Sequence, residues 1–166
     1  METSTEKAKG SCFAGAILAR GLGLLIVRLA VGSIFIYHGA QKVFGAFGGM
    51  GMQKFAASAV AALHPPILPT MAWAWLSAGT EFFGGCLVLV GLITRLPALL
   101  LVINMLMALR LLHMTGTGFA DPNIEFVLSL IAMNALLVLA GPGILSLDAL
   151  LFRCGKWCFR ASNKTS

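Results

Sequence analysis

Long apolar segments alternate with short polar stretches along the chain. The four longest apolar segments cover residues 22–44, 71–93, 96–113 and 123–140. Each is close to the length of about 20 residues that a helix needs to cross the hydrocarbon core of a bilayer. None shows the alternation of apolar and polar residues that marks a transmembrane β-strand. The pattern therefore predicts an all-α fold, a four-helix membrane bundle that runs up, down, up and down.

Turn-forming residues between these segments predict how the helices are connected. Thr94 precedes Pro97, so we expect Thr94 to cap the third helix and the second and third helices to be antiparallel neighbours. Asp121 and Pro122 are predicted to be the N-cap and the first residue of the fourth helix. The alanine-rich segment at residues 50–63 is too short to span, and its amphipathic character predicts a position along the outer membrane surface.

The composition indicates a membrane protein rather than a soluble domain. Of the 166 residues, 58% are hydrophobic and 11% are charged, whereas soluble domains carry about 25% charged residues. We divide the chain into a polar N-terminal tail at residues 1–19, a membrane domain at residues 20–150 and a basic tail at residues 151–166.

The net charge of +6 is unevenly distributed, and its distribution predicts the orientation of the bundle. Basic residues gather before the first apolar segment, at Arg95 between the second and third, and after the fourth. Because basic loops face the cytoplasm, both termini are predicted to be cytoplasmic in a multi-pass protein of the cell membrane. The charges lie at helix ends and form no basic patch interleaved with aromatic residues, so no nucleic acid is expected as a partner.

Polar residues inside the apolar segments are the candidates for function, because a charged side chain at the bilayer centre costs about 2.5–3.5 kcal/mol. At a rise of about 1.5 Å per helical residue, a middle layer is predicted that contains Arg28, Glu81, Asn104 and Asn134. A second layer lies nearer the outer face and contains His38, Gln41, Lys42, Arg110, His113 and Glu125.

Glu81 is the central candidate of the middle layer. It shares one face of its helix with Trp73, Ser77, Thr80 and Gly84. That face is predicted to point into the bundle, where Arg28 and Arg110 are the cations at neighbouring depth. Glu81 is interpreted either as half of a structural ion pair that fixes the helix register or as a proton or ligand site, the usual hypothesis for an ionisable residue inside a membrane.

His38 and His113 raise the alternative of haem ligation, because they are predicted at similar height on different helices. No C-x-x-C-H motif accompanies them and both lie close to the aqueous boundary, so haem is disfavoured, and no metal site is predicted. We expect these histidines to shape a polar vestibule together with Lys42 and Arg110, which Glu125 can neutralise. The simpler alternative is that these interfacial side chains extend to water.

Three segments of the chain resemble the DoxX family of small membrane proteins. They are VRLAVGSIFIYHGAQKVFG in the first apolar segment, TEFFGGCLVLVGLITRLPALLL across the second and third, and GPGILSLD after the fourth. The resemblance covers residues 22–150 and implies a four-helix fold. It also implies a link to membrane redox reactions, since some members belong to a thiosulfate:quinone oxidoreductase or to an oxidoreductase complex of thiol and oxidative stress. The chain has no C-x-x-C pair, and Cys154 with Cys158 is a poor substitute for direct thiol–disulfide exchange.

The residues and the resemblance together predict a membrane subunit that binds a quinone or a small apolar ligand within the bundle. A quinone needs hydrogen-bond donors and a proton source at its carbonyl oxygens. We assign that chemistry to Glu81, Arg28 and His38, and further ligand contacts to Lys42, Gln41, Trp73, Asn104, Arg110, His113 and Glu125. A catalytic chain would be a subunit of a quinone-linked oxidoreductase, with a partner protein or further copies of itself. The alternative is a non-enzymatic membrane anchor, assembly factor or small-molecule carrier.

Overall fold

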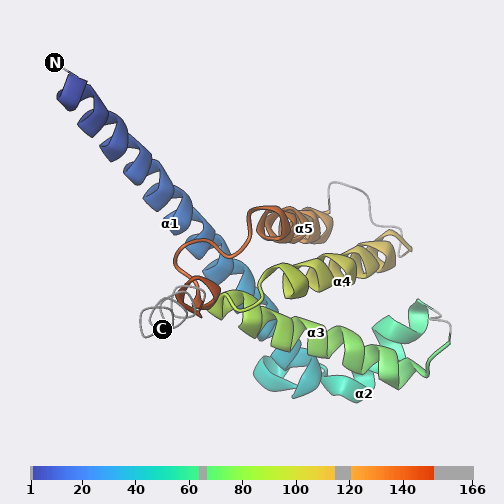
Figure 1. The fold of residues 1–166 in the computed structure, drawn as a ribbon. Coiled ribbons are helices and arrows are strands. Elements are labelled where there is room, and N and C mark those ends of the chain that lie inside the picture. Colours follow the sequence, from blue (N-terminus) through green and yellow to red (C-terminus); the bar gives the residue numbers. More distant parts are fainter. Residues whose placement is uncertain (1, 64–66, 115–120, 152–166) are drawn as a thin grey trace, which may run out of the picture.

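The computed structural model describes residues 2–63, 67–114 and 121–151, with side chains from residue 15 onward (Figure 1). Its helices are α1 (Glu2–Val43), η1 (Ala46–Gly48), α2 (Gly51–Phe55), η2 (Ala56–Val60), α3 (Thr70–Val90), α4 (Arg95–Met114) and α5 (Pro122–Ala140). No strand occurs in this described part of the chain. The predicted basic tail, with Cys154 and Cys158, lies outside the described residues apart from residue 151.

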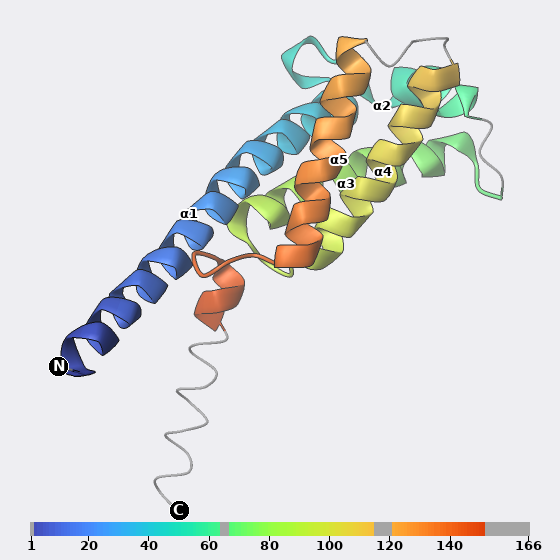
Figure 2. The ribbon, with the colours of Figure 1, turned by 90° about the horizontal axis from the view of Figure 1, so that it is seen from above.

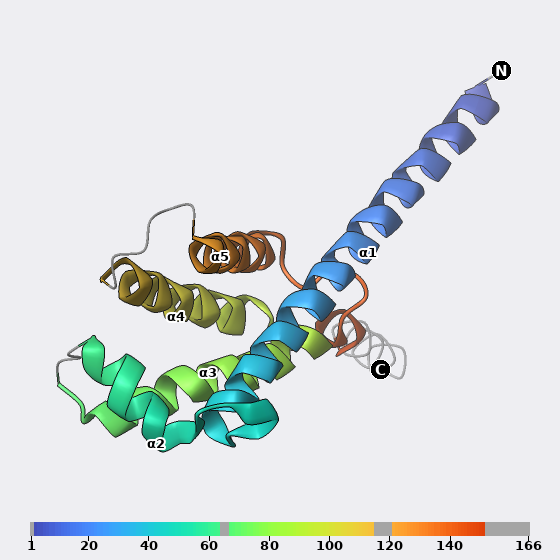
Figure 3. The same cartoon turned by 180° about the vertical axis from the view of Figure 1, so that it is seen from behind.

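Four helices are long and apolar enough to cross a membrane. They are the segments Gly15–Val43, Thr70–Val90, Arg95–Met114 and Pro122–Ala140. The predicted all-α fold with four spans is therefore confirmed. Helix α1 begins well before its span, at Glu2, and its first half projects away from the rest of the bundle (Figures 1 and 3). The segment predicted as a polar tail thus continues the first transmembrane helix.

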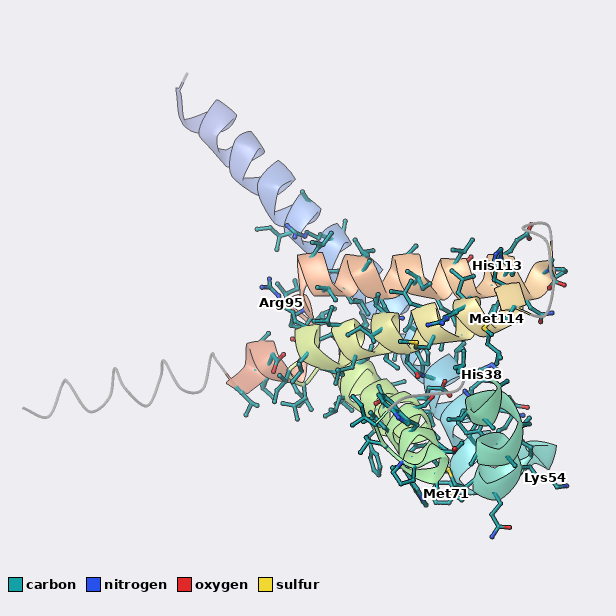
Figure 4. The ribbon with its side chains drawn as sticks, turned by 90° about the vertical axis from the view of Figure 1, so that its right-hand side faces the viewer. His38, Lys54, Met71, Arg95, His113 and Met114 are labelled. Atoms are coloured by element: carbon teal, nitrogen blue, oxygen red, sulfur yellow. The ribbon has the colours of Figure 1, made fainter. Side chains whose placement is uncertain are left out.

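The chain passes back and forth between two ends of the bundle. Figure 4 shows Arg95 at the end from which the N-terminal part of α1 also emerges, and His113, Met114 and Met71 at the opposite end. We call the first the turn end, after the α3–α4 turn at residues 91–94, and the second the loop end, where α4 stops and α3 and α5 begin. The first half of α1 and the segment after α5 both lie at the turn end (Figure 2).

Helices α1 and α3 run antiparallel and pack closely because glycines line their contact. A Cβ atom on Gly39 would lie 2.5 Å from the backbone nitrogen of Phe82. A Cβ atom on Gly32 would lie 2.8 Å from the Cβ atom of Leu89. Small residues allow the same close approach between helices in other membrane proteins. These two contacts, seven residues apart on each helix, fix the register of α1 against α3.

All four spanning helices contribute to one apolar core. Its most deeply buried members are at most 1% exposed: Val31 and Phe35 of α1, Val88 of α3, Ala98 and Leu101 of α4, and Leu137 of α5. Helix α4 packs against both α3 and α5. Because lipid tails are as apolar as these side chains, such packing stabilises the bundle through close contact rather than through exclusion of water.

The segment between α1 and α3 folds back onto the first half of α3. Helices α2 and η2 bury one apolar face against α3, formed by Phe55, Ala56 and Val60 on one side and Ala74 and Ala78 on the other. The face expected to rest on the outer membrane surface is therefore covered by protein. As a result, α1 ends beside the middle of α3, and the two short helices cover the remainder.

The helix caps agree with the sequence at α5 and differ at α4. Asp121 accepts a hydrogen bond from the Asn123 backbone nitrogen at 2.8 Å, which confirms the predicted cap of α5. The predicted cap by Thr94 is wrong, because its Oγ1 atom is buried without a partner among the described residues. A capping side chain at position 94 would bind the backbone N–H of residue 96 or residue 97. The N–H of Leu96 instead donates to the Ile93 carbonyl, and Pro97 has no N–H.

Asp148 instead holds the backbone immediately before α4. Its carboxylate accepts hydrogen bonds from the backbone nitrogens of Ile93 at 2.9 Å and Thr94 at 3.4 Å. Its own backbone nitrogen donates to the Gly91 carbonyl at 3.1 Å. The GPGILSLD segment, residues 141–148, is thereby fastened to the α3–α4 turn, and we call it the strap.

Candidate functional site

An ion pair between α1 and α3 is the central feature of the site. The Nζ atom of Lys42, in the last turn of α1, lies 2.5 Å from both carboxylate oxygens of Glu81 in the middle of α3. The side chain of Glu81 is 2% exposed, and that of Lys42 is 25% exposed. The pair is therefore buried at its carboxylate and partly open at its ammonium group.

Asn104 and Ser77 extend this ion pair into a network with α4. The Asn104 amide nitrogen donates to Glu81 Oε1 at 2.8 Å, and the Ser77 hydroxyl donates to the Asn104 amide oxygen at 2.7 Å. Ser77 and Glu81 are four residues apart and lie on one face of α3. The prediction that this face points into the bundle is confirmed. We call Lys42, Ser77, Glu81 and Asn104 the polar cluster.

Phe55 of α2 covers the ammonium group of the polar cluster. The Lys42 Nζ atom lies 5.0 Å from the centroid of the Phe55 ring, within the range of a cation–π interaction. Phe55 is 7% exposed, so its ring separates this side of the ion pair from the surroundings. The sequence analysis did not single out Phe55. The available signal was that it is the one aromatic residue in the alanine-rich segment at residues 50–63.

The prediction that Arg28 or Arg110 neutralises Glu81 is wrong. It assumed that the predicted ends of all four helices lie at the same two heights. In the structure Lys42 stands level with Glu81, so α1 stops about 16 Å short of the first residue of α3 along the helix axis. Arg28 lies about 21 Å before Lys42 along α1, which places it at the turn end. The two predicted layers are therefore displaced against each other.

Arg28 instead binds four backbone carbonyl groups. Its Nε and one terminal nitrogen donate to Val88 and Leu89 at the end of α3, both at 3.0 Å. Its other terminal nitrogen donates to Pro142 and Leu145 of the strap at 2.9 and 2.8 Å. The residue is 2% exposed. A cation is stabilised at the C-terminal end of a helix, so Arg28 joins α1, α3 and the strap at the turn end.

The structure places six further predicted site residues outside the polar cluster. The His38 ring has its centroid 5.5 Å from that of Tyr37 and 6.2 Å from that of Phe126 in α5. Gln41 and Trp73 are half-buried, and Trp73 packs on the contact between η2 and α3. Three further residues are exposed: Arg110, His113 and Glu125. Figure 4 shows His38 on α1 and His113 at the loop end of α4.

Asn134 is buried and separate from the polar cluster. Its amide nitrogen donates to the Leu130 carbonyl of its own helix at 2.8 Å. Its amide oxygen is buried without a partner among the described residues. The middle layer expected from the sequence thus divides into three places: Glu81 with Asn104, Asn134 within α5, and Arg28 at the turn end.

The polar cluster contains more hydrogen-bond donors than its internal contacts use. An ammonium group has three N–H bonds and a carboxamide nitrogen has two. Glu81 accepts two hydrogen bonds from Lys42 and one from Asn104. In the described part of the chain, one N–H of Lys42 and one of Asn104 therefore have no acceptor within the cluster. These two N–H groups can donate hydrogen bonds to an oxygen atom of a ligand.

Comparisons with known proteins identify the family. The DoxX family model matches residues 23–114, more than half of the chain and a range that includes the whole polar cluster. A protein of Bacillus subtilis (strain 168) named "Putative oxidoreductase CatD" is 27% identical over an alignment of 138 positions that covers 80% of this chain and 89% of that protein. No solved structure matches the chain significantly. The chain is a membrane protein and belongs to the DoxX family.

Proposed function

We propose that this protein is the membrane subunit of an oxidoreductase and binds a quinone-type ligand at the polar cluster. The observation that carries the proposal is the buried Glu81 carboxylate, which donors from two other helices hold in the membrane domain. The relative from Bacillus subtilis, which is named as an oxidoreductase, supports the redox class. An ionisable residue inside a membrane usually marks a ligand or proton pathway.

The chemistry of the polar cluster fits a ligand with carbonyl oxygens. A quinone takes up two electrons and two protons when it becomes a quinol. The remaining N–H groups of Lys42 and Asn104 can donate to one carbonyl oxygen, and Lys42 can transfer a proton to that oxygen as negative charge develops. Glu81 stabilises the positive charge of Lys42 before the transfer. The two electrons come from a partner oxidoreductase. The second proton reaches the other carbonyl oxygen from water, and water also returns a proton to Lys42, whose side chain is 25% exposed.

The arrangement changes the roles assigned to two predicted residues. Lys42 takes the place of Arg28 beside Glu81 and is the proton donor of the proposed site. Arg28 uses its nitrogens on four carbonyl groups. We therefore propose that Arg28 holds α1 in position and does not contact the ligand. Asn104, assigned to ligand contacts from the sequence, keeps that role.

We further propose that the protein lies in the cell membrane with its turn end in the cytoplasm. The exposed residues Arg20 and Arg95 lie toward that end, and basic residues mark the cytoplasmic side. The projecting part of α1 provides a surface there for the partner oxidoreductase (Figure 3). A homo-oligomer that completes the complex is the alternative partner.

The competing function is a non-enzymatic anchor, assembly factor or carrier. It is favoured by the observation that Lys42 and Glu81 satisfy each other, because such a pair can serve only to join α1 to α3. Under this function, loss of the pair lowers the amount of folded protein and activity in proportion.

Ligand retention distinguishes the two functions. The protein is extracted gently from its native membrane, and bound lipids and proteins are identified by native mass spectrometry for the wild type, Glu81→Gln and Glu125→Gln. Glu125 is exposed on α5 and makes no side-chain hydrogen bond to the polar cluster in the described structure, so we propose no ligand contact for it and use its variant as the matched control. We expect a quinone with the wild type and with Glu125→Gln, and its loss from a folded Glu81→Gln protein. A protein partner retained by all three, with no quinone in any, would refute quinone binding.

A further inference from the structure

A strip of aromatic rings at the loop end connects three separate elements. Phe47 of η1 stacks on Tyr37 of α1, with ring centroids 5.0 Å apart and planes at 25°. Tyr37 meets His38 edge-on at 5.5 Å, and His38 meets Phe126 of α5 at 6.2 Å. These distances and angles are typical of favourable aromatic contacts. We call Tyr37, His38, Phe47 and Phe126 the aromatic strip.

The rings of the aromatic strip are open to their surroundings. Tyr37 and Phe126 are each 43% exposed, and Phe47 is 70% exposed. By contrast, Phe35, which packs in the core, is 1% exposed. Ring faces that are exposed in a membrane domain meet lipid, and they can stack with flat molecules dissolved there.

The backbone at Phe47 is strained in a way that places its ring on Tyr37. Phe47 has φ of 54° and ψ of 33°, a left-handed conformation that a bulky residue rarely adopts. Its neighbours Gly45 and Gly48 also have positive φ, and glycine at position 47 would remove the strain. Strain of this kind is retained where the side chain has a function. The ring of Phe47 is therefore kept despite an unfavourable backbone.

The aromatic strip and the polar cluster are neighbours on α1. His38 and Lys42 are four residues apart on α1, so they share one face of the helix about 6 Å apart along its axis. A flat ring that stacks beside His38 would bring an oxygen on its edge toward Lys42. The strip also lies on the side of the bundle where α1 meets α5, and both helices there expose apolar side chains to lipid.

We propose that the aromatic strip is the site where a flat, lipid-soluble ring compound with carbonyl oxygens enters the protein from the bilayer. This inference rests on the proposed function, whose ligand belongs to the same chemical class. The ring stacks on Phe47, Tyr37 and Phe126, passes His38, and then presents an oxygen to Lys42 and Asn104. The strip therefore controls how fast the ligand arrives, and the polar cluster controls whether it stays.

The test measures loading over time. Wild type, Phe47→Ala, Phe126→Ala and Phe83→Ala are placed in lipid nanodiscs and mixed with an azido-benzoquinone probe. Samples are illuminated at successive times, and labelled peptides are quantified by mass spectrometry. Phe83 of α3 is 65% exposed and outside the strip, so it controls for the loss of any lipid-facing ring. We expect about fivefold slower loading for Phe47→Ala and Phe126→Ala, with an unchanged final level, and wild-type rates for Phe83→Ala.

A second variant separates this role from a structural one. Phe47→Gly removes both the ring and the backbone strain, so it should unfold no more easily than the wild type and still load slowly. Unchanged loading in all strip variants would overturn the inference. Equal slowing in Phe83→Ala would also overturn it, because the rings would then act only as a general interfacial belt of aromatic residues.

The same experiment distinguishes failure of the inference from failure of the proposed function. Early label on Phe47 or on α5 of the wild type, with no later label on Lys42, α3 or α4, would support the entry site and refute binding at the polar cluster. Label on α3 and α4 that arrives at the same rate in all variants would leave the proposed function in place and refute the entry site.

Discussion

Separation of the Lys42–Glu81 pair should destabilise the bundle more than the loss of any exposed charge. Lys42→Met leaves a carboxylate that is 2% exposed with Asn104 as its remaining partner. Breaking a buried ion pair by removing one partner costs about 3–5 kcal/mol. Because Lys42 itself is 25% exposed, we expect the lower end of this range, about 3 kcal/mol.

Replacement of both partners should restore most of the lost stability. The double variant Lys42→Met/Glu81→Met leaves no unpaired charge, and apolar replacements of buried pairs are often close to neutral. The wild type, Lys42→Met, Glu81→Met and the double variant form a double-mutant cycle. We expect a coupling free energy of about 3 kcal/mol between Lys42 and Glu81. Free energies of unfolding are measured by reversible denaturation in mixed detergent micelles, followed by circular dichroism.

The matched control is a cycle on two exposed charges. Lys54 and Glu125 are both exposed and share no contact in the described structure, so Lys54→Met and Glu125→Met should each change the free energy of unfolding by less than about 0.5 kcal/mol. The reasoning would be refuted by a coupling below about 0.5 kcal/mol between Lys42 and Glu81. It would equally be refuted if Lys42→Met cost no more than Lys54→Met.

Three further substitutions test the packing that positions the site. Arg28→Met should lower the free energy of unfolding by about 3 kcal/mol in the same denaturation assay, because four carbonyl groups lose a charged donor. Gly39→Ala should cost about 1–3 kcal/mol, since its Cβ atom would lie 2.5 Å from the Phe82 backbone, whereas Gly23→Ala, with nothing within 4 Å, should not destabilise. Asp148→Ala should cost about 1 kcal/mol through loss of its hydrogen bonds to the backbone before α4, seen as faster hydrogen exchange at residues 93 and 94. Stability equal to wild type in Arg28→Met or Asp148→Ala, or equal effects of the two glycine substitutions, would contradict these contacts.

Local features of the sequence predicted the helices and the direction of the polar face. The length and apolar character of the four segments depend only on neighbouring residues, and so does the Asp121 cap. Ser77 and Glu81 could be assigned to one face because helical periodicity alone determines their relation. These predictions needed no knowledge of which helix lies beside which.

Contacts between distant segments were not predictable in the same way. The partner of Glu81 depends on how far α1 is displaced along α3, and that register follows from glycine contacts such as Gly39 against Phe82. The sequence shows the glycines but not which residue each one meets. The backbone before α4 is likewise held by Asp148, more than 50 residues away, whereas the sequence offered only the local candidate Thr94. Phe55 reaches Lys42 only because α2 folds back onto α3.

The central claim is that Lys42 and Asn104 donate hydrogen bonds to a carbonyl oxygen of the ligand. Infrared difference spectroscopy of the protein in lipid, with a quinone carrying ¹³C at one carbonyl, measures this directly. A carbonyl that accepts such bonds absorbs at lower frequency than the same quinone in lipid alone. The account predicts this shift for the wild type, a smaller shift for Asn104→Leu and for Lys42→Met, and none for the double variant Lys42→Met/Asn104→Leu. A carbonyl band in the wild type that is identical to that of the quinone in lipid alone would contradict it.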